Sequence, residues 1–169
     1  MRILALIGLL AILGAIGAAT FFFGGYYDVG ASAARPAVVD WALANVRAAS
    51  IARQATDRAP VALDDPATIQ AGARAFAARG CVVCHGAPGV NWEKFPEGMN
   101  PWPADLKEIA RQRDAAQIFW VAKNGIGMTG MPGFGSEGVP DQELWTIAAF
   151  VKKLPAVSDA DYKAWTAAK

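Results

Sequence analysis

Both cysteines and the single histidine of this 169-residue chain lie in one pentapeptide, Cys81-Val82-Val83-Cys84-His85. The side chains best suited to bind a metal or form a covalent link are thus confined to one short stretch. Cys-x-x-Cys-His is the attachment sequence of c-type haem, in which two thiols form thioethers with the haem vinyl groups and the histidine binds the iron. The pentapeptide therefore predicts one covalent haem c per chain, bound by Cys81, Cys84 and His85.

Three other uses of a Cys-x-x-Cys pair are alternatives with less support. A closed zinc site takes four ligands, usually cysteine or histidine, and the chain has three such residues. A thioredoxin-type redox pair begins a helix after a strand, and nothing around residue 81 has the pattern of a strand. A disulfide across two residues closes a very small loop and adds little stability.

The second axial ligand decides what a haem of this kind can do. The composition excludes a second histidine, which leaves a methionine, a lysine or an open position. Met99 follows His85 closely, in a Pro-rich loop, whereas Met128 and Met131 lie in the segment KNGIGMTGMPGFG. A lone methionine is most often core filler, but the glycines of this segment allow its backbone to approach a flat ring. We therefore expect this segment to lie on the distal side of the haem, where it would supply the second axial ligand.

The motif CVVCHG, followed by TGMPGF, resembles the class I cytochrome c family of the membrane-anchored bacterial type. The resemblance covers about residues 66–155 and implies an all-α fold, a class I cytochrome c haem domain. In that family the methionine of the Met-Pro pair is the distal iron ligand. The resemblance therefore implies ligation by His85 and Met131, with Met128 as the second candidate.

The same resemblance assigns two further contacts to the haem. Thr129, two residues before the expected ligand, matches a donor to a haem propionate. In the family, a proline carbonyl after the attachment motif accepts the imidazole N–H of the proximal histidine, which implies Pro101 or Pro103 here.

Three segments carry helix signals. In DDPATIQAGARAFAARGC, Asp65 is a possible N-cap and Pro66 stands at a first helical position. RDAAQIFWVAKNG predicts a helix that Asp114 caps and Asn-Gly ends, and it places Trp120 in the core or the haem wall. PDQELWTIAAFVKKLP begins with acids and ends with two lysines, which matches the helix dipole.

The resemblance also implies that the first and last helices of the haem domain cross where a glycine meets an aromatic residue. Gly72 and Phe76, set against Ile147 and Phe150, fit that contact. Beyond this crossing, the tail VSDADYKAW predicts a further helix that begins at the Ser-x-x-Asp pattern of residues 158–161.

Residues 3–23 contain no charge and form about 31 Å of helix, enough to cross a bilayer. Arg2 favours a cytoplasmic N-terminus, and Phe21–Phe23 with Tyr26 and Tyr27 suit an outer aromatic belt. In the family that the chain resembles, haem is attached outside the cytoplasmic membrane. We therefore expect a single-pass anchor in a bacterial cytoplasmic membrane, with the haem domain on the periplasmic side. A cleaved signal peptide, cut at GAAT or ASAA, is the alternative, although its apolar core is normally shorter.

The expected organisation is an anchor at residues 1–23, a linker at 24–64 and a haem domain with its tail at 65–169. Within the linker the sequence predicts an alanine-rich helix over about residues 36–57. Its apolar stripe suits packing on the haem domain or docking to a membrane partner, and both interpretations are open. The stripe consists of Val39, Leu43, Val46 and Ser50.

The charge is balanced, with 16 basic and 15 acidic residues, which argues against nucleic acid as a partner. With His85 on the iron, no histidine remains for acid–base catalysis. The expected function is therefore one-electron transfer, between respiratory complexes or as the haem subunit of a dehydrogenase or terminal oxidase, with the lipid bilayer and redox proteins as partners. The alternatives are a haem enzyme or gas sensor with an open sixth position, and a structural haem subunit of a membrane complex.

Overall fold

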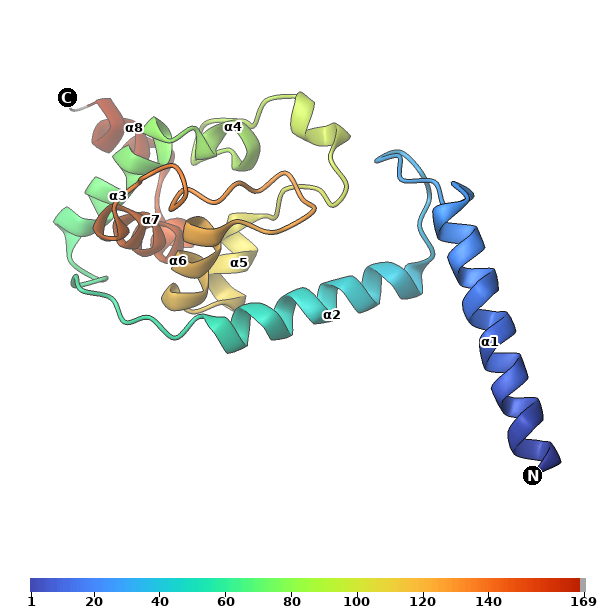
Figure 1. Ribbon diagram of the computed structural model, residues 1–169. Coiled ribbons are helices and arrows are strands. Elements are labelled where there is room, and N and C mark those ends of the chain that lie inside the picture. The colour runs from blue at the N-terminus through green and yellow to red at the C-terminus, as the bar shows by residue number, and fades with distance from the viewer. Residues whose placement is uncertain (168–169) are drawn as a thin grey trace. The chain divides into compact units, whose positions relative to one another are not determined.

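The structure is a computed structural model that describes residues 1–167, and within them every regular element is a helix (Figure 1). The all-α prediction is therefore confirmed. The elements are α1 (Arg2–Phe23), α2 (Ala37–Gln54), α3 (Pro66–Ala78), α4 (Cys81–His85), η1 (Phe95–Gly98), α5 (Leu106–Gln112), α6 (Ala115–Asn124), α7 (Asp141–Lys153), η2 (Leu154–Ala156) and α8 (Asp159–Ala167).

The chain divides into two compact units, one of residues 1–34 and one that begins at Arg35. The first unit consists of α1 and the turn after it. Among residues 1–167, α1 is the one helix long and apolar enough to cross a membrane. At its end the rings of Phe21 and Phe22 lie 6.2 and 5.3 Å from that of Tyr27. The place of these rings in an outer aromatic belt stays a prediction.

In the second unit, α3 and α7 cross at close range. The backbone of Gly72 lies directly against the carbonyl group of Thr146, and a Cβ placed on Gly72 would lie 2.9 Å from the Cβ of Phe150. One turn further along, the rings of Phe76 and Phe150 meet at 5.3 Å. The predicted contact between a glycine and an aromatic residue is confirmed.

Helices α3 and α6 begin at the N-caps predicted from the sequence, Asp65 and Asp114. Asp65 accepts a hydrogen bond from the backbone N–H of Thr68 at 2.9 Å, and Asp114 accepts one from that of Gln117 at 2.8 Å. The ring of Phe119 on α6 stacks on Trp145 of α7 with centroids 4.1 Å apart. This stack and the α3–α7 crossing form one buried core.

Helix α5 was not predicted. Asp105 caps it by accepting a hydrogen bond from the N–H of Lys107 at 2.8 Å. At its other end, Lys152 of α7 donates to the carbonyl oxygens of Ala110 and Arg113 at 2.6 and 2.8 Å. A helix of two turns depends on such contacts from outside itself, because nucleation is costly for short segments.

The tail helix α8 begins as predicted. The hydroxyl of Ser158 accepts the backbone N–H of Asp161 at 3.1 Å and donates to its carboxylate at 2.6 Å. Tyr162 is buried, and its ring lies 5.7 Å from that of Phe150. The tail therefore contributes to the core as well as covering its surface.

Helix α2 ends at Gln54, three residues before the predicted end, and it packs against α6. Ile51 is buried, and Ala44, Ala48 and Ala55 lie half-buried at helical spacing from it. The contacts therefore group α2 with the rest of the second unit rather than with a separate linker. The predicted stripe does not make this contact, because Val46 lies two residues from both Ala44 and Ala48, about 200° around the helix.

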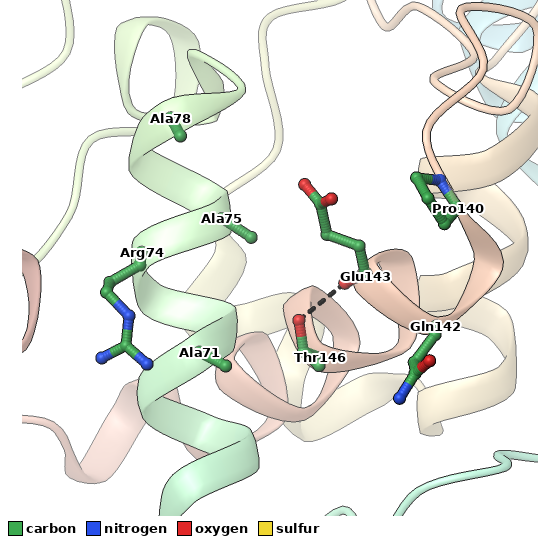
Figure 2. Close-up of a pocket in the computed structure, with 8 residues that line it drawn as sticks. All are labelled: Ala71, Arg74, Ala75, Ala78, Pro140, Gln142, Glu143 and Thr146. Atoms are coloured by element: carbon green, nitrogen blue, oxygen red, sulfur yellow. Dashed lines mark hydrogen bonds between the residues drawn. The ribbon is translucent and has the colours of Figure 1, made fainter. Parts of the chain in front are cut away.

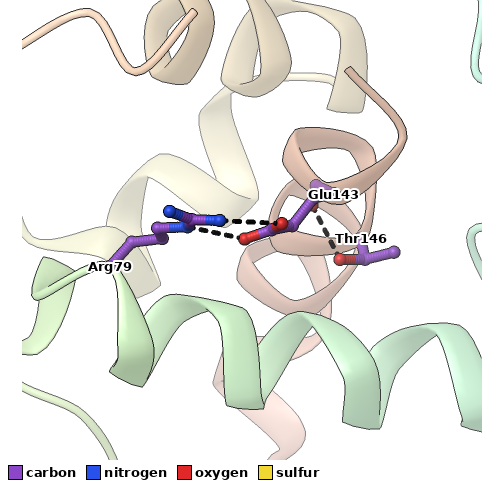
Figure 3. Close-up of polar contacts among 3 residues, drawn as sticks. All are labelled: Arg79, Glu143 and Thr146. Carbon is purple, nitrogen blue, oxygen red and sulfur yellow. Dashed lines mark hydrogen bonds and ion pairs between the residues drawn. The ribbon is translucent and has the colours of Figure 1, made fainter. Parts of the chain in front are cut away.

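An ion pair joins the end of α3 to the first turn of α7 (Figure 3). The Nε of Arg79 lies 2.7 Å from one carboxylate oxygen of Glu143, and a terminal nitrogen lies 3.0 Å from the other. The hydrogen bond from Arg79 holds the pKa of Glu143 below its usual value of 4.5. The carboxylate form of Glu143 is therefore favoured by folding.

Replacing Glu143 by Gln is expected to make the protein less sensitive to acid. A carboxyl group whose pKa is depressed in the folded state stabilises it above the unfolded pKa, and that contribution is lost as the pH falls through the folded pKa. Below about pH 4.5 the wild-type protein should therefore lose stability more steeply than Glu143→Gln in denaturation series at pH 3 to 7. Glu97→Gln, at an exposed position, is the matched control. Parallel curves for wild type and Glu143→Gln would contradict the role of the ion pair.

Candidate haem-binding site

The attachment pentapeptide forms a helix of its own, α4, which is a little over one turn long. Gly80, with a φ of +74°, separates α4 from α3, and Gly86, with a φ of +63°, ends it. Side chains at i and i+3 lie on one face of a helix, so Cys81 and Cys84 project to the same side. This spacing suits two thioethers to a single ring.

The imidazole of His85 is oriented by one hydrogen bond. Its Nδ1 lies 2.9 Å from the carbonyl oxygen of Ala104. A carbonyl oxygen only accepts, so Nδ1 carries the proton and Nε2 keeps its lone pair for a metal. Burial lowers the pKa of His85, which favours the neutral form, although the hydrogen bond to Ala104 opposes the shift.

The prediction that Pro101 or Pro103 supplies this carbonyl is wrong. The acceptor is Ala104, the residue after Pro103 and the one before the N-cap Asp105 of α5. Neighbouring carbonyls in a non-helical segment point in different directions, so a shift of one residue changes which of them reaches the ring. The start of α5 fixes this register, and α5 was not predicted.

Cys81 is packed against the hydrophobic core, and the two cysteines are not joined to each other. Desolvation raises the pKa of the Cys81 thiol to about 11. Reactive cysteines have depressed pKa values and electropositive surroundings. The environment of Cys81 therefore does not suit a reactive nucleophilic thiol.

The segment between α6 and α7 folds back on itself. Gly125, with a φ of +70°, ends α6, and the N–H of Ile126 donates to the carbonyl of Met131 at 3.1 Å. Thr129 donates its hydroxyl to Ile126 at 2.8 Å and accepts the N–H of Met131 at 3.2 Å. Thr129 thus shapes the loop that carries Met131, and its contact with a propionate stays a prediction.

The two candidate distal methionines differ in where their side chains lie. Met131 is half-buried and packs against the core, whereas Met128 is fully exposed, with a backbone φ of +60°. A thioether that already packs against the core loses less freedom on binding iron than a fully exposed one. This geometry favours Met131 over Met128.

A third methionine lies beside this loop. A Cβ built on Gly130 would lie 2.5 Å from the sulfur of Met99, so the Met99 side chain rests directly on the Gly130 backbone. Met99 therefore joins the loop after His85 to the loop that carries Met131. Sequence reasoning missed this contact, and the only signal was a methionine in the Pro-rich loop.

Trp120 is half-buried on α6, and its backbone carbonyl accepts a hydrogen bond from the side chain of Asn124 at 2.9 Å. Its place in a haem wall stays a prediction. The donor set as a whole fits haem c. It comprises two thiols on one helical turn, an imidazole with a free Nε2 and a thioether on a compact loop.

A cleft of about 540 Å³ lies over the α3–α7 crossing (Figure 2). In Figure 2 the side chain of Arg74 points away from that of Glu143. None of the predicted haem residues lines this cleft, so it is separate from the candidate site. The lining residues are Ala71, Arg74, Ala75, Ala78, Pro140, Gln142, Glu143 and Thr146.

A family model described as cytochrome c oxidase, cbb3-type, subunit III matches residues 67–151, which is half of the chain. The matched range begins at the start of α3 and ends within α7. It includes α4, the loop of Met131 and both helices of the crossing. No curated protein and no solved structure matches the chain.

Proposed function

Because the chain belongs to the family of cbb3-type cytochrome c oxidase subunit III, and is therefore a c-type cytochrome that carries electrons on covalent haem c, we propose that His85 and Met131 are its two axial ligands. The proposed role is that of a one-electron carrier tethered to a membrane. Cys81 and Cys84 form the thioethers, and Thr129 and Trp120 line the site.

The observation that carries this proposal is the contrast between His85 and Met131 on one side and Met128 on the other. His85 is fixed by Ala104 with Nε2 free, and Met131 is packed inward, while Met128 faces solvent. When bound, the haem supplies an iron that cycles between the ferric and ferrous states. Because both ligands are held by the fold, they stay in place through the cycle. The Met131 thioether is a weak donor that favours ferrous iron and raises the reduction potential.

The proposed location is the periplasmic face of a bacterial cytoplasmic membrane, with α1 as an uncleaved single-pass anchor. The organisation is an anchor at residues 1–23, a short link at residues 24–34, and a haem domain at 65–169 to which α2 is attached. A tether keeps the carrier close to its partners and raises their effective concentration. Because the family description names an oxidase, the proposed partners are a terminal oxidase, another respiratory complex or a dehydrogenase.

A redox titration of the purified holoprotein, followed by exposure of its ferrous form to carbon monoxide, tests the proposed function. We expect a one-electron transition and a ferrous spectrum that carbon monoxide leaves unchanged, because both axial positions are filled by protein. Rapid binding of carbon monoxide by the wild-type protein would overturn the electron-carrier proposal in favour of an open-site enzyme or sensor. The same preparation should retain haem in denaturant, which confirms covalent attachment through Cys81 and Cys84.

A further inference from the structure

The first half of α2 exposes large apolar side chains. Val38, Trp41, Leu43 and Val46 have exposed fractions of 66, 67, 54 and 67%. The segment AVVDWALANV contains one charged residue, Asp40, and its charge is paired with Arg35 at 3.1 Å. A helical segment that is apolar around so much of its circumference is normally covered by something.

The haem domain does not provide that cover. It holds α2 through the second half of the helix, where Ile51 is buried against the domain, and through Arg35, which donates a hydrogen bond to the side chain of Asn100. Both ends of the helix are therefore fixed to the domain, while the apolar surface of its first half remains exposed.

Most of the unpaired charges near this surface are positive, and Asp57 is the exception. Arg47, Arg53 and Arg58 are exposed, and within residues 1–167 no ion pair involves any of them. Over residues 35–58 the basic residues number four and the acidic residues two. An exposed apolar surface with arginines beside it matches a bilayer interface that contains anionic lipids.

The chain also limits how far α2 lies from the end of α1. Residues 24–34 follow α1 and end the first unit, and eleven residues span at most about 40 Å when fully extended. Arg35, immediately after this stretch, is fixed to the haem domain. The first turn of α2 is therefore confined to the neighbourhood of the membrane surface whenever α1 spans the bilayer.

We propose that the first half of α2 lies on the lipid surface of the membrane that holds α1. Val38, Trp41, Leu43 and Val46 enter the boundary between headgroups and acyl chains, and Arg47 and Arg53 face anionic headgroups. Tryptophan suits this depth because its ring is apolar and its N–H is polar. The proposal rests on one part of the proposed function, namely that α1 is retained as an anchor.

The test uses full-length holoprotein in vesicles of phosphatidylcholine with and without phosphatidylglycerol. In holoprotein both native cysteines are consumed by the haem, so Leu43→Cys offers a single free thiol for an environment-sensitive fluorophore. Ala160→Cys, at an exposed position on α8, is the matched control. We expect a blue-shifted emission at position 43 and at least twofold stronger quenching by a shallow lipid-bound nitroxide than at position 160. Phosphatidylglycerol should increase the quenching at position 43. Replacing both Arg47 and Arg53 by Gln in the same protein should remove that increase.

Equal, water-like emission at both positions would overturn the proposal and indicate that α2 meets solvent or a protein partner. Flotation of the protein with vesicles after an alkaline wash tests the anchor separately, and the redox spectrum tests the haem. A protein that floats and shows a normal redox spectrum, but keeps position 43 in water, refutes this inference alone.

Discussion

Replacing Met131 by alanine is expected to abolish the weak methionine–iron charge-transfer band of the ferric protein, at the red edge of the visible spectrum. The ferrous variant should then bind carbon monoxide. Met131 is packed against the core, and two hydrogen bonds, from Ile126 and to Thr129, fix its backbone. Met128 faces solvent and Met99 rests on the Gly130 backbone, so we expect the loss of the Met131 thioether to leave the sixth site open. Loss of the thioether should also lower the reduction potential, because methionine ligation raises it.

Met128→Ala and Met99→Ala are the matched controls for this experiment. Met128 is fully exposed, so its loss should leave the band, the potential and the response to carbon monoxide unchanged. Met99→Ala should keep the band, although the loss of its contact with Gly130 is expected to loosen the loop. If Met128→Ala or Met99→Ala removes the band while Met131→Ala retains it, the assignment of Met131 is wrong.

Gly72→Ala is expected to destabilise the haem domain by at least about 3 kcal/mol, at the upper end of the range for overpacked cores. The added Cβ would overlap the carbonyl group of Thr146 and lie 2.9 Å from the Cβ of Phe150. The obstacle is helix backbone, which cannot rotate out of the way as a long side chain can. Helices α3 and α7 would have to separate, and this would also disturb the contact between Phe76 and Phe150.

Denaturant unfolding of the holoprotein, followed by circular dichroism and haem absorbance, measures this effect. Gly98→Ala is the control, because a Cβ at Gly98 meets nothing within 4 Å and its φ is not in the left-handed region. Gly98→Ala should keep the wild-type midpoint. Similar midpoints for both variants would mean that the two helices do not approach as closely as the structure shows.

Helix starts with strong local chemistry could be predicted from sequence. Asp65 before Pro66, Asp114 three residues before Gln117, and Ser158 three before Asp161 all act as caps, and each depends on contacts within one turn. The haem motif could also be identified, since its chemistry lies in five consecutive residues.

Features that depend on distant contacts could not be predicted. Helix α5 relies on Lys152, some forty residues away, to bind its last carbonyls. The carbonyl that accepts the hydrogen bond from His85 is that of Ala104 and not that of Pro101 or Pro103, because the start of α5 sets the register of that loop. The face of α2 that packs on the domain could not be recognised from the sequence either. Three alanines and one isoleucine make the contact, and they attract less notice in a sequence than valine and leucine.

The hydrogen bond from Arg35 to Asn100 shortens the length of chain that separates the end of α1 from the haem domain. A free chain over residues 24–64 would extend to about 140 Å, whereas residues 24–34 alone extend to about 40 Å. Because volume scales with the cube of reach, fixing Arg35 reduces the largest volume that the domain can reach roughly fiftyfold. If α1 is retained as a membrane anchor, as we propose, a carrier on so short a tether is expected to exchange electrons with its immediate neighbours in the membrane, and to reach distant complexes only by diffusing there together with its anchor.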